Sequence, residues 1–240
     1  MDPRTRRVLR QHVRTDQLLG ADDVPLGSRA DAAEPAPTRG PADAQDRAEL
    51  LRQLDENEVR GCTKCELCHG RTQTVFGEGN PAAQIMFVGE GPGQTEDQKG
   101  RPFVGRAGEL LDKQIVAMNL TRDQVYIANV VKCRPPNNRT PTPIEVATCT
   151  AYLRQQIQII QPRVIIALGG PATKHLLDTR EGITKLRGTW HHYDGLPPDG
   201  PSIPVMPTFH PAYLLRAYSP DNRGKVWSDL QQVMKLLAGS

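Results

Sequence analysis

The sequence predicts an α/β protein, a three-layer α/β/α sandwich with a central four-stranded parallel sheet. Four short apolar runs have the length and composition of buried strands: residues 83–90, 124–131, 163–170 and 203–211. Stretches with helical spacing of apolar residues alternate with them, at residues 106–120, 142–160, 170–178 and 223–239. Strands that are apolar along their whole length, alternating with helices, indicate a parallel sheet covered on both faces.

Composition limits the class of protein. The chain has 240 residues and a formal net charge of +3, which permits a polyanionic partner without demonstrating one. No apolar run approaches the roughly 20 residues that cross a bilayer, and the N-terminus lacks the apolar core of a signal peptide. We therefore expect no membrane association and a cytoplasmic location.

The N-terminal segment, residues 1–46, is rich in Ala, Asp, Pro and Gly and has no periodic apolar pattern. Such a composition predicts a disordered extension, and the folded domain is expected at residues 47–240. The arginines of residues 4–14 could contact nucleic acid, but a solvated tail is the preferred interpretation. From Asp46, a plausible N-cap, a helix is expected to lead to the cysteines.

The first strand is followed by "GEGPGQTEDQKGRPF", residues 89–103. A dinucleotide fingerprint is not favoured, because Pro92 and a polar loop separate the glycines from the next helix, near Arg106, and no acidic residue ends a second strand about 20 residues further on. Glycines here suit a backbone that approaches a flat ligand closely, and Glu90, Glu96 and Asp97 are available for acid or base chemistry. The alternative is a turn with solvated acidic side chains.

Two further strand ends carry candidate functional residues. Asn129 has an amide that can donate and accept, so it could read the edge of a planar base, although an Asn there is also a common cap or turn residue. His210 could donate to a developing anion, or could be an ordinary surface residue. The carboxyl ends of parallel strands share one sheet edge, where ligands bind in such folds.

Three of the five cysteines, Cys62, Cys65 and Cys68, lie close together, and Cys133 and Cys149 follow. Disulfides are rare in a reducing cytoplasm, so this spacing favours metal or cluster binding, or redox chemistry. Four thiolates satisfy either a tetrahedral zinc site or an iron–sulfur cluster, and the spacing does not separate the two.

The chain from about Asp46 to Leu237 resembles the iron–sulfur uracil-DNA glycosylases, commonly called family 4. Five blocks in order carry the resemblance: "CTKC" at 62–65, "GEGPGQTEDQKGRPFVGRAGELL" at 89–111, "NVVKCRPPNNRTPTPIE" at 129–145, "LGGPA" at 168–172 and "HPAYLLR" at 210–216.

The resemblance implies a 4Fe–4S cluster on Cys62, Cys65, Cys133 and Cys149. Cys68 is then a surplus thiol, or a substitute ligand when Cys65 is lost. The resemblance also implies an activity, the release of uracil from DNA after the nucleotide rotates out of the stack.

The roles of individual residues follow from the same resemblance. Phe103 is expected to stack on the base and Asn129 to read its edge, while His210 and the Gly91 N–H stabilise charge on the departing uracil. Glu90 and Glu96 are candidates for orienting water. The family pattern usually carries another acid near Gln94 or Thr95, so its absence here suggests that the essential carboxylate lies elsewhere.

DNA contacts are expected from Leu214 or Leu215, which could fill the gap left by the flipped base unless both belong to the core. The phosphate candidates are Lys132, Arg134, Arg139, Lys174 and Arg216. A covalently trapping relative has a basic, His-bearing insert that this chain lacks, so turnover by hydrolysis is expected.

The expected partner is uracil-containing double- or single-stranded DNA, bound by a monomer without a nucleotide cofactor. Two other functions are open: a non-catalytic DNA-binding or polymerase-associated iron–sulfur module, and a zinc-stabilised hydrolase acting on nucleotides.

Overall fold

The computed structural model describes residues 44–195 and 201–239. The predicted disordered extension therefore lies outside the described residues as far as residue 43. Helix α2 (Ala44–Leu54) begins earlier than expected, so Asp46 lies in its first turn and not at the N-cap. A carboxylate in the first turn still interacts favourably with the helix dipole. A π-helical turn, η1 (Asp55–Val59), continues α2 toward the cysteines.

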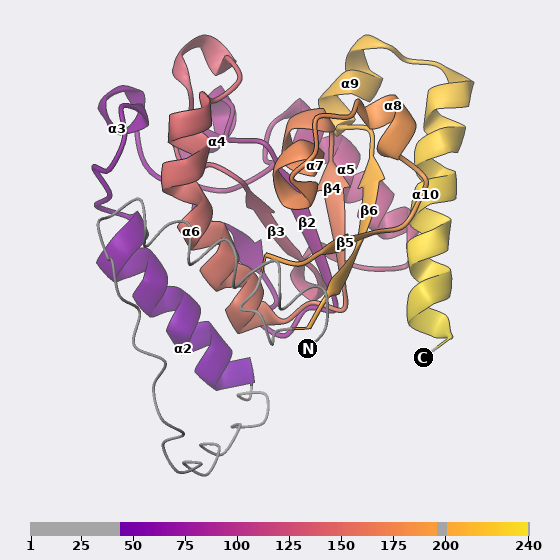
Figure 1. Cartoon of the computed structure of the whole chain (residues 1–240), viewed down its shortest axis with the longest axis horizontal. Coiled ribbons are helices and arrows are strands. Elements are labelled where there is room, and N and C mark those ends of the chain that lie inside the picture. The colour runs from indigo at the N-terminus through magenta and orange to yellow at the C-terminus, as the bar shows by residue number, and fades with distance from the viewer. Residues whose placement is uncertain (1–43, 196–200, 240) are drawn as a thin grey trace, which may run out of the picture. The chain divides into compact units, whose positions relative to one another are not determined.

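The predicted four-stranded parallel sheet is confirmed. Its strands are β2 (Ile85–Gly89), β3 (Tyr126–Asn129), β4 (Val164–Leu168) and β6 (Ile203–Thr208), in the spatial order β3-β2-β4-β6. Two antiparallel edge strands that the sequence did not predict, β1 (Glu78–Gly79) and β5 (His191–Tyr193), extend it to six. The four parallel strands end at one edge, at the top of Figure 1.

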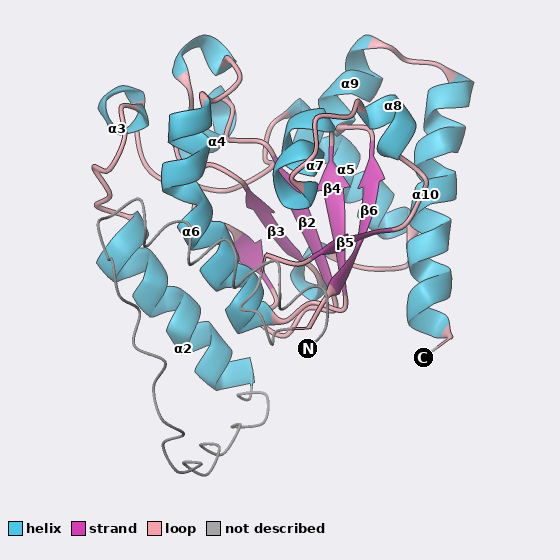
Figure 2. Ribbon diagram, viewed as in Figure 1, coloured by secondary structure: helices cyan, strands magenta, loops and turns pink. Residues whose placement is uncertain are grey.

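Helices cover both faces of the sheet, as the apolar strands require (Figure 2). Alternate strand residues point to opposite sides. Met86 and Val88 pack with α2, α6 (Pro143–Ile160) and α7 (Gly170–Leu177). Ile85 and Phe87 pack with α5 (Arg106–Ala117) and α10 (Pro220–Ala238). The three-layer α/β/α architecture is therefore confirmed.

Two short helices follow strands of the parallel sheet. The loop expected after the first strand contains α4 (Gln94–Lys99), and "HPAYLLR" forms α9 (Pro211–Arg216). The remaining short elements are α3 (Leu67–Gly70), η2 (Arg122–Gln124), η3 (Pro136–Asn138) and α8 (Ile183–Leu186).

Helix α6 starts where its sequence dictates. Thr142 and Glu145 form a reciprocal capping box, and Pro143 occupies the first turn, where a missing N–H costs nothing. This start fixes the position of Cys149, which lies on the same helix. Within the described ranges, no helix is long and apolar enough to span a membrane.

Candidate active site

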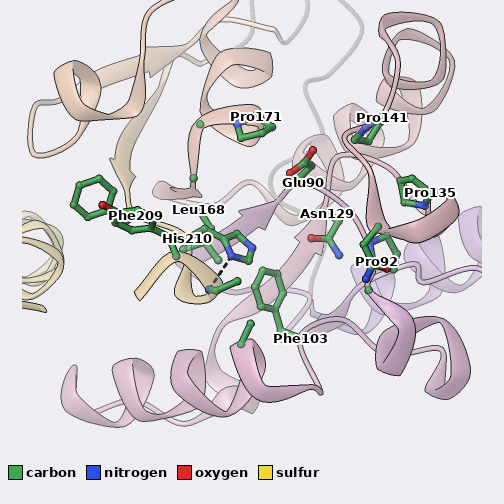
Figure 3. Close-up of a pocket in the computed structure, with 18 of the residues that line it drawn as sticks. Glu90, Pro92, Phe103, Asn129, Pro135, Pro141, Leu168, Pro171, Phe209 and His210 are labelled. Atoms are coloured by element: carbon green, nitrogen blue, oxygen red, sulfur yellow. Dashed lines mark hydrogen bonds between the residues drawn. The ribbon is translucent and has the colours of Figure 1, made fainter. Parts of the chain in front are cut away.

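A pocket of about 620 Å³ opens at the carboxyl edge of the parallel strands. All six residues predicted to bind the base or orient water line it: Glu90, Gly91, Glu96, Phe103, Asn129 and His210. In Figure 3 the side chains of Phe103, Asn129 and His210 gather around one space, with Glu90 across from them. The loops after β2, β3 and β6 thus bring together side chains that are up to 120 positions apart, from Glu90 to His210.

The floor of the pocket depends on close packing around Phe103. Its ring lies with its centroid 5.5 Å from that of His210, tilted by 32°. The backbone of Phe103 has a φ of +51°, an uncommon conformation for a bulky residue. Helix α5 presses directly on it, since a Cβ on Gly108 would lie 1.8 Å from the Phe103 carbonyl oxygen. The strained backbone is therefore held by its neighbours.

Asn129 is nearly fully buried, with 1% of its surface exposed. Its Oδ1 atom has no hydrogen-bond partner among the described residues. A buried amide oxygen without a donor is costly, which makes it a marker of a missing ligand when it faces a pocket. The side chain is therefore placed to accept a hydrogen bond from a bound molecule.

Glu90 is the second residue with such an orphaned atom, Oε1. Burial raises the pKa of this carboxyl group above its ordinary value, against the opposing effect of a hydrogen bond with Thr140. The pocket thus contains a half-buried carboxylate with one oxygen free to accept from a ligand or a water molecule.

Glu96, which the sequence could not separate from Glu90, has different contacts. Its Oε1 accepts hydrogen bonds from the backbone N–H groups of Val104 and Gly105, at 2.9 and 2.8 Å. Gly105 is the N-cap residue of α5, so the carboxylate lies where a helix dipole favours negative charge. Glu96 therefore fixes the segment that carries Phe103.

His210 has a defined tautomer. Its Nδ1 accepts a hydrogen bond from the backbone N–H of Ala212 at 3.0 Å, the contact drawn as a dashed line in Figure 3, so the neutral ring carries its proton on Nε2. Burial lowers the pKa of His210 to about 4, and the positive charge of Arg216 adds to the effect. At neutral pH the residue is an uncharged donor at the pocket.

The predicted phosphate contact of Lys132 is wrong in this structure. Only 1% of the residue is exposed, and its Nζ donates to the Asn129 carbonyl oxygen at 2.8 Å and to Gln156 Oε1 at 2.5 Å. Burial lowers the pKa of Lys132 to about 8. The side chain points into the protein, so it cannot reach a DNA backbone.

The other residues predicted to contact DNA differ in their exposure to solvent. Leu214 is 2% exposed and belongs to the core beneath α9, so its proposed role in filling the DNA gap is wrong, whereas Leu215 is 39% exposed. Arg216 is exposed and lines the pocket. Arg134 is partly exposed and donates through Nε to Asn138 Oδ1 at 2.8 Å.

Arg139, another phosphate candidate, is exposed and lines the pocket, but its guanidinium is paired with a carboxylate. Both of its Nη atoms contact Glu145, at 2.8 and 2.7 Å, and this pairing lowers the pKa of Glu145 to about 2. The guanidinium therefore stabilises the start of α6, while Lys174, the remaining candidate, is exposed on α7.

A second, smaller pocket is lined by all five cysteines: Cys62, Cys65, Cys68, Cys133 and Cys149. Three of the four predicted ligands accept hydrogen bonds at sulfur. Tyr152 donates to Cys62 at 3.2 Å, Arg71 to Cys133 at 3.1 Å, and the Lys132 backbone N–H to Cys149 at 3.2 Å. In the described part of the chain, no three His, Cys, Asp or Glu side chains converge as one metal ion requires.

The chain segments that carry Glu96 and the early cysteines are joined by a contact that the sequence did not reveal. Asp97 on α4 is buried and accepts the Thr72 backbone N–H at 2.9 and 3.0 Å, which ties the cysteine-bearing segment to the helix of Glu96. The sequence alone does not indicate which acidic side chain of this loop is buried, so it does not single out Asp97.

Comparison with known proteins identifies the family. Residues 76–231 match the Uracil DNA glycosylase superfamily. The type-4 uracil-DNA glycosylase of Thermotoga maritima is 48% identical over 192 residues, covering 80% of this chain and 96% of its own length. That of Sulfurisphaera tokodaii is 46% identical over 194 residues, covering 78% and 84%. The chain belongs to the type-4 uracil-DNA glycosylases.

Membership in this family agrees with the placement of the motifs. The superfamily match includes the three loops of the active-site pocket but begins after Cys62 and Cys65. The longer matches to type-4 glycosylases extend beyond it, to about four fifths of the chain. The early cysteine pair therefore lies in the part of the chain that the superfamily match leaves out.

Proposed function

We propose that this type-4 uracil-DNA glycosylase removes uracil from DNA by hydrolysing the bond between the base and deoxyribose. The observation that carries the proposal is the buried, unpartnered Oδ1 of Asn129. It lies in a pocket that also contains the ring of Phe103 and the neutral imidazole of His210. A flat base that offers an N–H beside a carbonyl group satisfies all three.

Binding requires the nucleotide to rotate out of the helix, at a cost of a few kcal/mol that is lower for mismatched or unpaired bases. Phe103 supplies an aromatic surface for the extruded ring. Asn129 Oδ1 accepts the N3–H of uracil and its Nδ2 donates to O4. Cytosine has an amine instead of O4 and no hydrogen on N3, so it would leave buried polar groups unpaired.

In the reaction the C1′–N1 bond breaks, and its electron pair moves to the uracil ring. The negative charge that develops near O2 is stabilised by Nε2–H of His210 and by the backbone of Gly91, which lines the pocket. A single donor of this type contributes about 3 kcal/mol to transition-state stabilisation in acyl-transfer enzymes. A neutral His is suited to this task because it donates without transferring its proton.

Water completes the reaction by adding to C1′, and the proton it loses is balanced by protonation of the uracil anion. Glu90 is the carboxylate proposed to orient this water, since its Oε1 is free and its pKa is raised by burial. Glu96 is a positioning residue in this scheme, because its carboxylate holds the N–H groups that follow Phe103.

The cysteine pocket is proposed to hold a 4Fe–4S cluster on Cys62, Cys65, Cys133 and Cys149. Four thiols that surround a pocket without converging on one point fit a cluster, whose irons each take a separate thiolate, better than a single zinc ion. The hydrogen bonds to three of the sulfurs are of the kind that stabilise thiolates in such sites. When bound, the cluster would brace the loops that reach the active site.

The proposal is tested by incubating the purified protein with single- and double-stranded oligonucleotides that carry one uracil. The expected result is free uracil, and strand cleavage only after alkali treatment. DNA binding without release of uracil would refute the activity and favour a non-catalytic module. A colourless protein that contains zinc would refute the cluster.

The non-catalytic alternative is not favoured, because the curated relatives are named as glycosylases and the pocket holds a full set of candidate groups. We further propose that the enzyme acts as a monomer on double- or single-stranded DNA, without a nucleotide cofactor. A cytoplasmic location is consistent with cysteines that must stay reduced to bind iron.

A further inference from the structure

Lys132 is one of the largest fully buried side chains in the described part of the protein. A lysine is almost never buried in this way unless its charge is compensated. Its Nζ donates to a backbone carbonyl and to an amide oxygen, both uncharged. Within the described residues, no ion pair joins this ammonium to a carboxylate.

The surroundings of Lys132 suggest where its counter-charge lies. Lys132 lines the cysteine pocket, and its backbone N–H donates to Cys149 Sγ at 3.2 Å. Its ammonium is also close enough to the Cys149 thiol to interact with it electrostatically. Four thiolates on a cluster of four irons give a group of net negative charge in the oxidation states that proteins commonly use. An anionic cluster in this pocket would therefore supply the counter-charge that the buried ammonium lacks among the described side chains.

The ammonium of Lys132 also contacts Asn129, a residue that lines the active-site pocket. Nζ holds the carbonyl oxygen of Asn129, the residue whose amide Oδ1 faces that pocket. Gln156 fixes the ammonium from behind, and its own Nε2 donates to the carbonyl of Phe76 at 2.9 Å and to Tyr126 OH at 3.3 Å. Lys132 thus contacts the end of the strand that carries Asn129 through its ammonium, and the cysteine pocket through its backbone N–H.

We propose that Lys132 is a positioning residue that couples the two sites: its ammonium balances the charge of the iron–sulfur cluster and holds the Asn129 backbone in the geometry that reads uracil. This inference rests on the proposed function. The positioning role replaces the phosphate contact that the sequence predicted for Lys132. The two roles predict different effects of removing the ammonium.

The experiment uses the Lys132→Met variant, which keeps the aliphatic stem and removes the charge and both hydrogen bonds. Lys235→Met, at an exposed position near the end of α10, is the matched control for loss of one positive charge. For each protein the measurements are iron content, the reduction potential of the cluster without DNA, and kcat and KM on a uracil-containing oligonucleotide at several salt concentrations.

Lys132→Met is expected to shift the reduction potential to more negative values, because a nearby positive charge stabilises the reduced cluster. It should lower kcat by about tenfold or more, the loss expected when a hydrogen bond to a charged group is removed. KM and its salt dependence should stay as in the control. A raised KM with a weaker salt dependence would instead indicate a phosphate contact and overturn the proposal.

A potential and a kcat equal to those of Lys235→Met would also overturn it, as would wild-type protein without iron. Should Lys132→Met fail to fold, Gln156→Glu provides a second test of nearly the same volume. The new carboxylate would pair with the ammonium and add negative charge near the cluster, so the potential should again fall. An unchanged potential would refute the charge contact.

The outcomes separate this inference from the proposed function. Wild-type protein that releases no uracil would refute the glycosylase activity. The potential difference between Lys132→Met and the wild type, measured without DNA, would still decide whether the ammonium and the cluster interact.

Discussion

Phe103 and Asn129 lie so close to each other across Gly89 that no side chain fits between them. A Cβ on Gly89 would lie 2.4 Å from Asn129 Oδ1 and 2.6 Å from Phe103 Cζ. Gly89 is the last residue of β2 and pairs in register with Asn129 on β3. The spacing between the Phe103 ring and the Asn129 amide is therefore set by the absence of a side chain at Gly89.

This arrangement predicts that Gly89→Ala lowers uracil excision by about tenfold or more. The new methyl group must displace Asn129 or Phe103, and overpacking of this kind costs about 1–3 kcal/mol. The rate of uracil release under single-turnover conditions measures the effect. Gly224→Ala is the control, because nothing lies within 4 Å of a Cβ there and Ala favours helix α10, so activity should be kept and stability slightly raised. Full activity in Gly89→Ala would contradict the proposed geometry.

The sheet could be predicted from the sequence because each of the four parallel strands is buried on both faces and reads as an apolar run. The edge strands β1 and β5 could not, since two and three residues contain no periodicity and their pairing depends on distant partners. The observed start of α10 also differs from the predicted one. The helix begins at Pro220, capped by the Ser219 hydroxyl, three residues before the apolar spacing that predicted a helix at 223–239.

The positions of the site residues were predicted largely through the family motifs. Residue chemistry alone did not distinguish Asn129 from an ordinary strand-end cap. The burial of Lys132 could not be predicted, because a lysine beside Cys133 and Arg134 suggests an exposed basic loop. Its burial is determined by Gln156, which lies 24 positions further along the chain on another element.

The different contacts of Glu90 and Glu96 predict different defects. Glu90→Gln should reduce kcat by about 100-fold, since an amide cannot serve as a base, and should leave stability unchanged or higher because the buried charge is gone. The acid limb of the wild-type pH–rate profile, set by a Glu90 pKa above its ordinary value, should be lost in this variant.

Glu96→Gln should instead lower the melting temperature, because one amide oxygen is a weaker acceptor for the N–H groups of Val104 and Gly105 than a carboxylate. Activity should fall through misplacement of Phe103, with the acid limb retained. Loss of the acid limb in Glu96→Gln, and its retention in Glu90→Gln, would reverse the two assignments.

Leu214 and Leu215 are adjacent and are predicted to have opposite effects. Leu214→Ala should destabilise the fold by about 2–5 kcal/mol, because it leaves a cavity in the core. Leu215→Ala should change stability by less than about 0.5 kcal/mol, but should slow excision from double-stranded DNA more than from single strands, where no gap has to be filled. Urea unfolding and paired excision assays separate these outcomes. Equal slowing on both substrates would contradict a gap-filling role for Leu215.

The surplus thiol provides a matched pair for the cluster. Cys149→Ala is expected to lose iron and solubility, since it removes a proposed ligand, which lies inside α6. Cys68→Ala should retain the full iron content even though Cys68 lines the same pocket. Iron analysis and visible absorbance of the two purified variants decide between them. Loss of iron in Cys68→Ala alone would exchange the two assignments.

His210 predicts how stability depends on pH. In the folded protein its pKa is about 4, below the ordinary value of 6.5 that applies when the chain unfolds. Between these values the unfolded state takes up a proton that the folded state does not, so the free energy of unfolding should decrease as the pH falls from about 6.5 to about 4. His210→Asn keeps an acceptor for the Ala212 N–H and removes the titrating group, so the free energy of unfolding of this variant should decrease less as the pH falls.

Urea midpoints measured from pH 7.5 to about pH 4.5 test this pH dependence, with His192→Asn, at an exposed position, as the control. If the midpoints of His210→Asn follow those of the wild type at every pH, the imidazole is not held neutral by burial, and its role as an uncharged donor to uracil loses its physical basis.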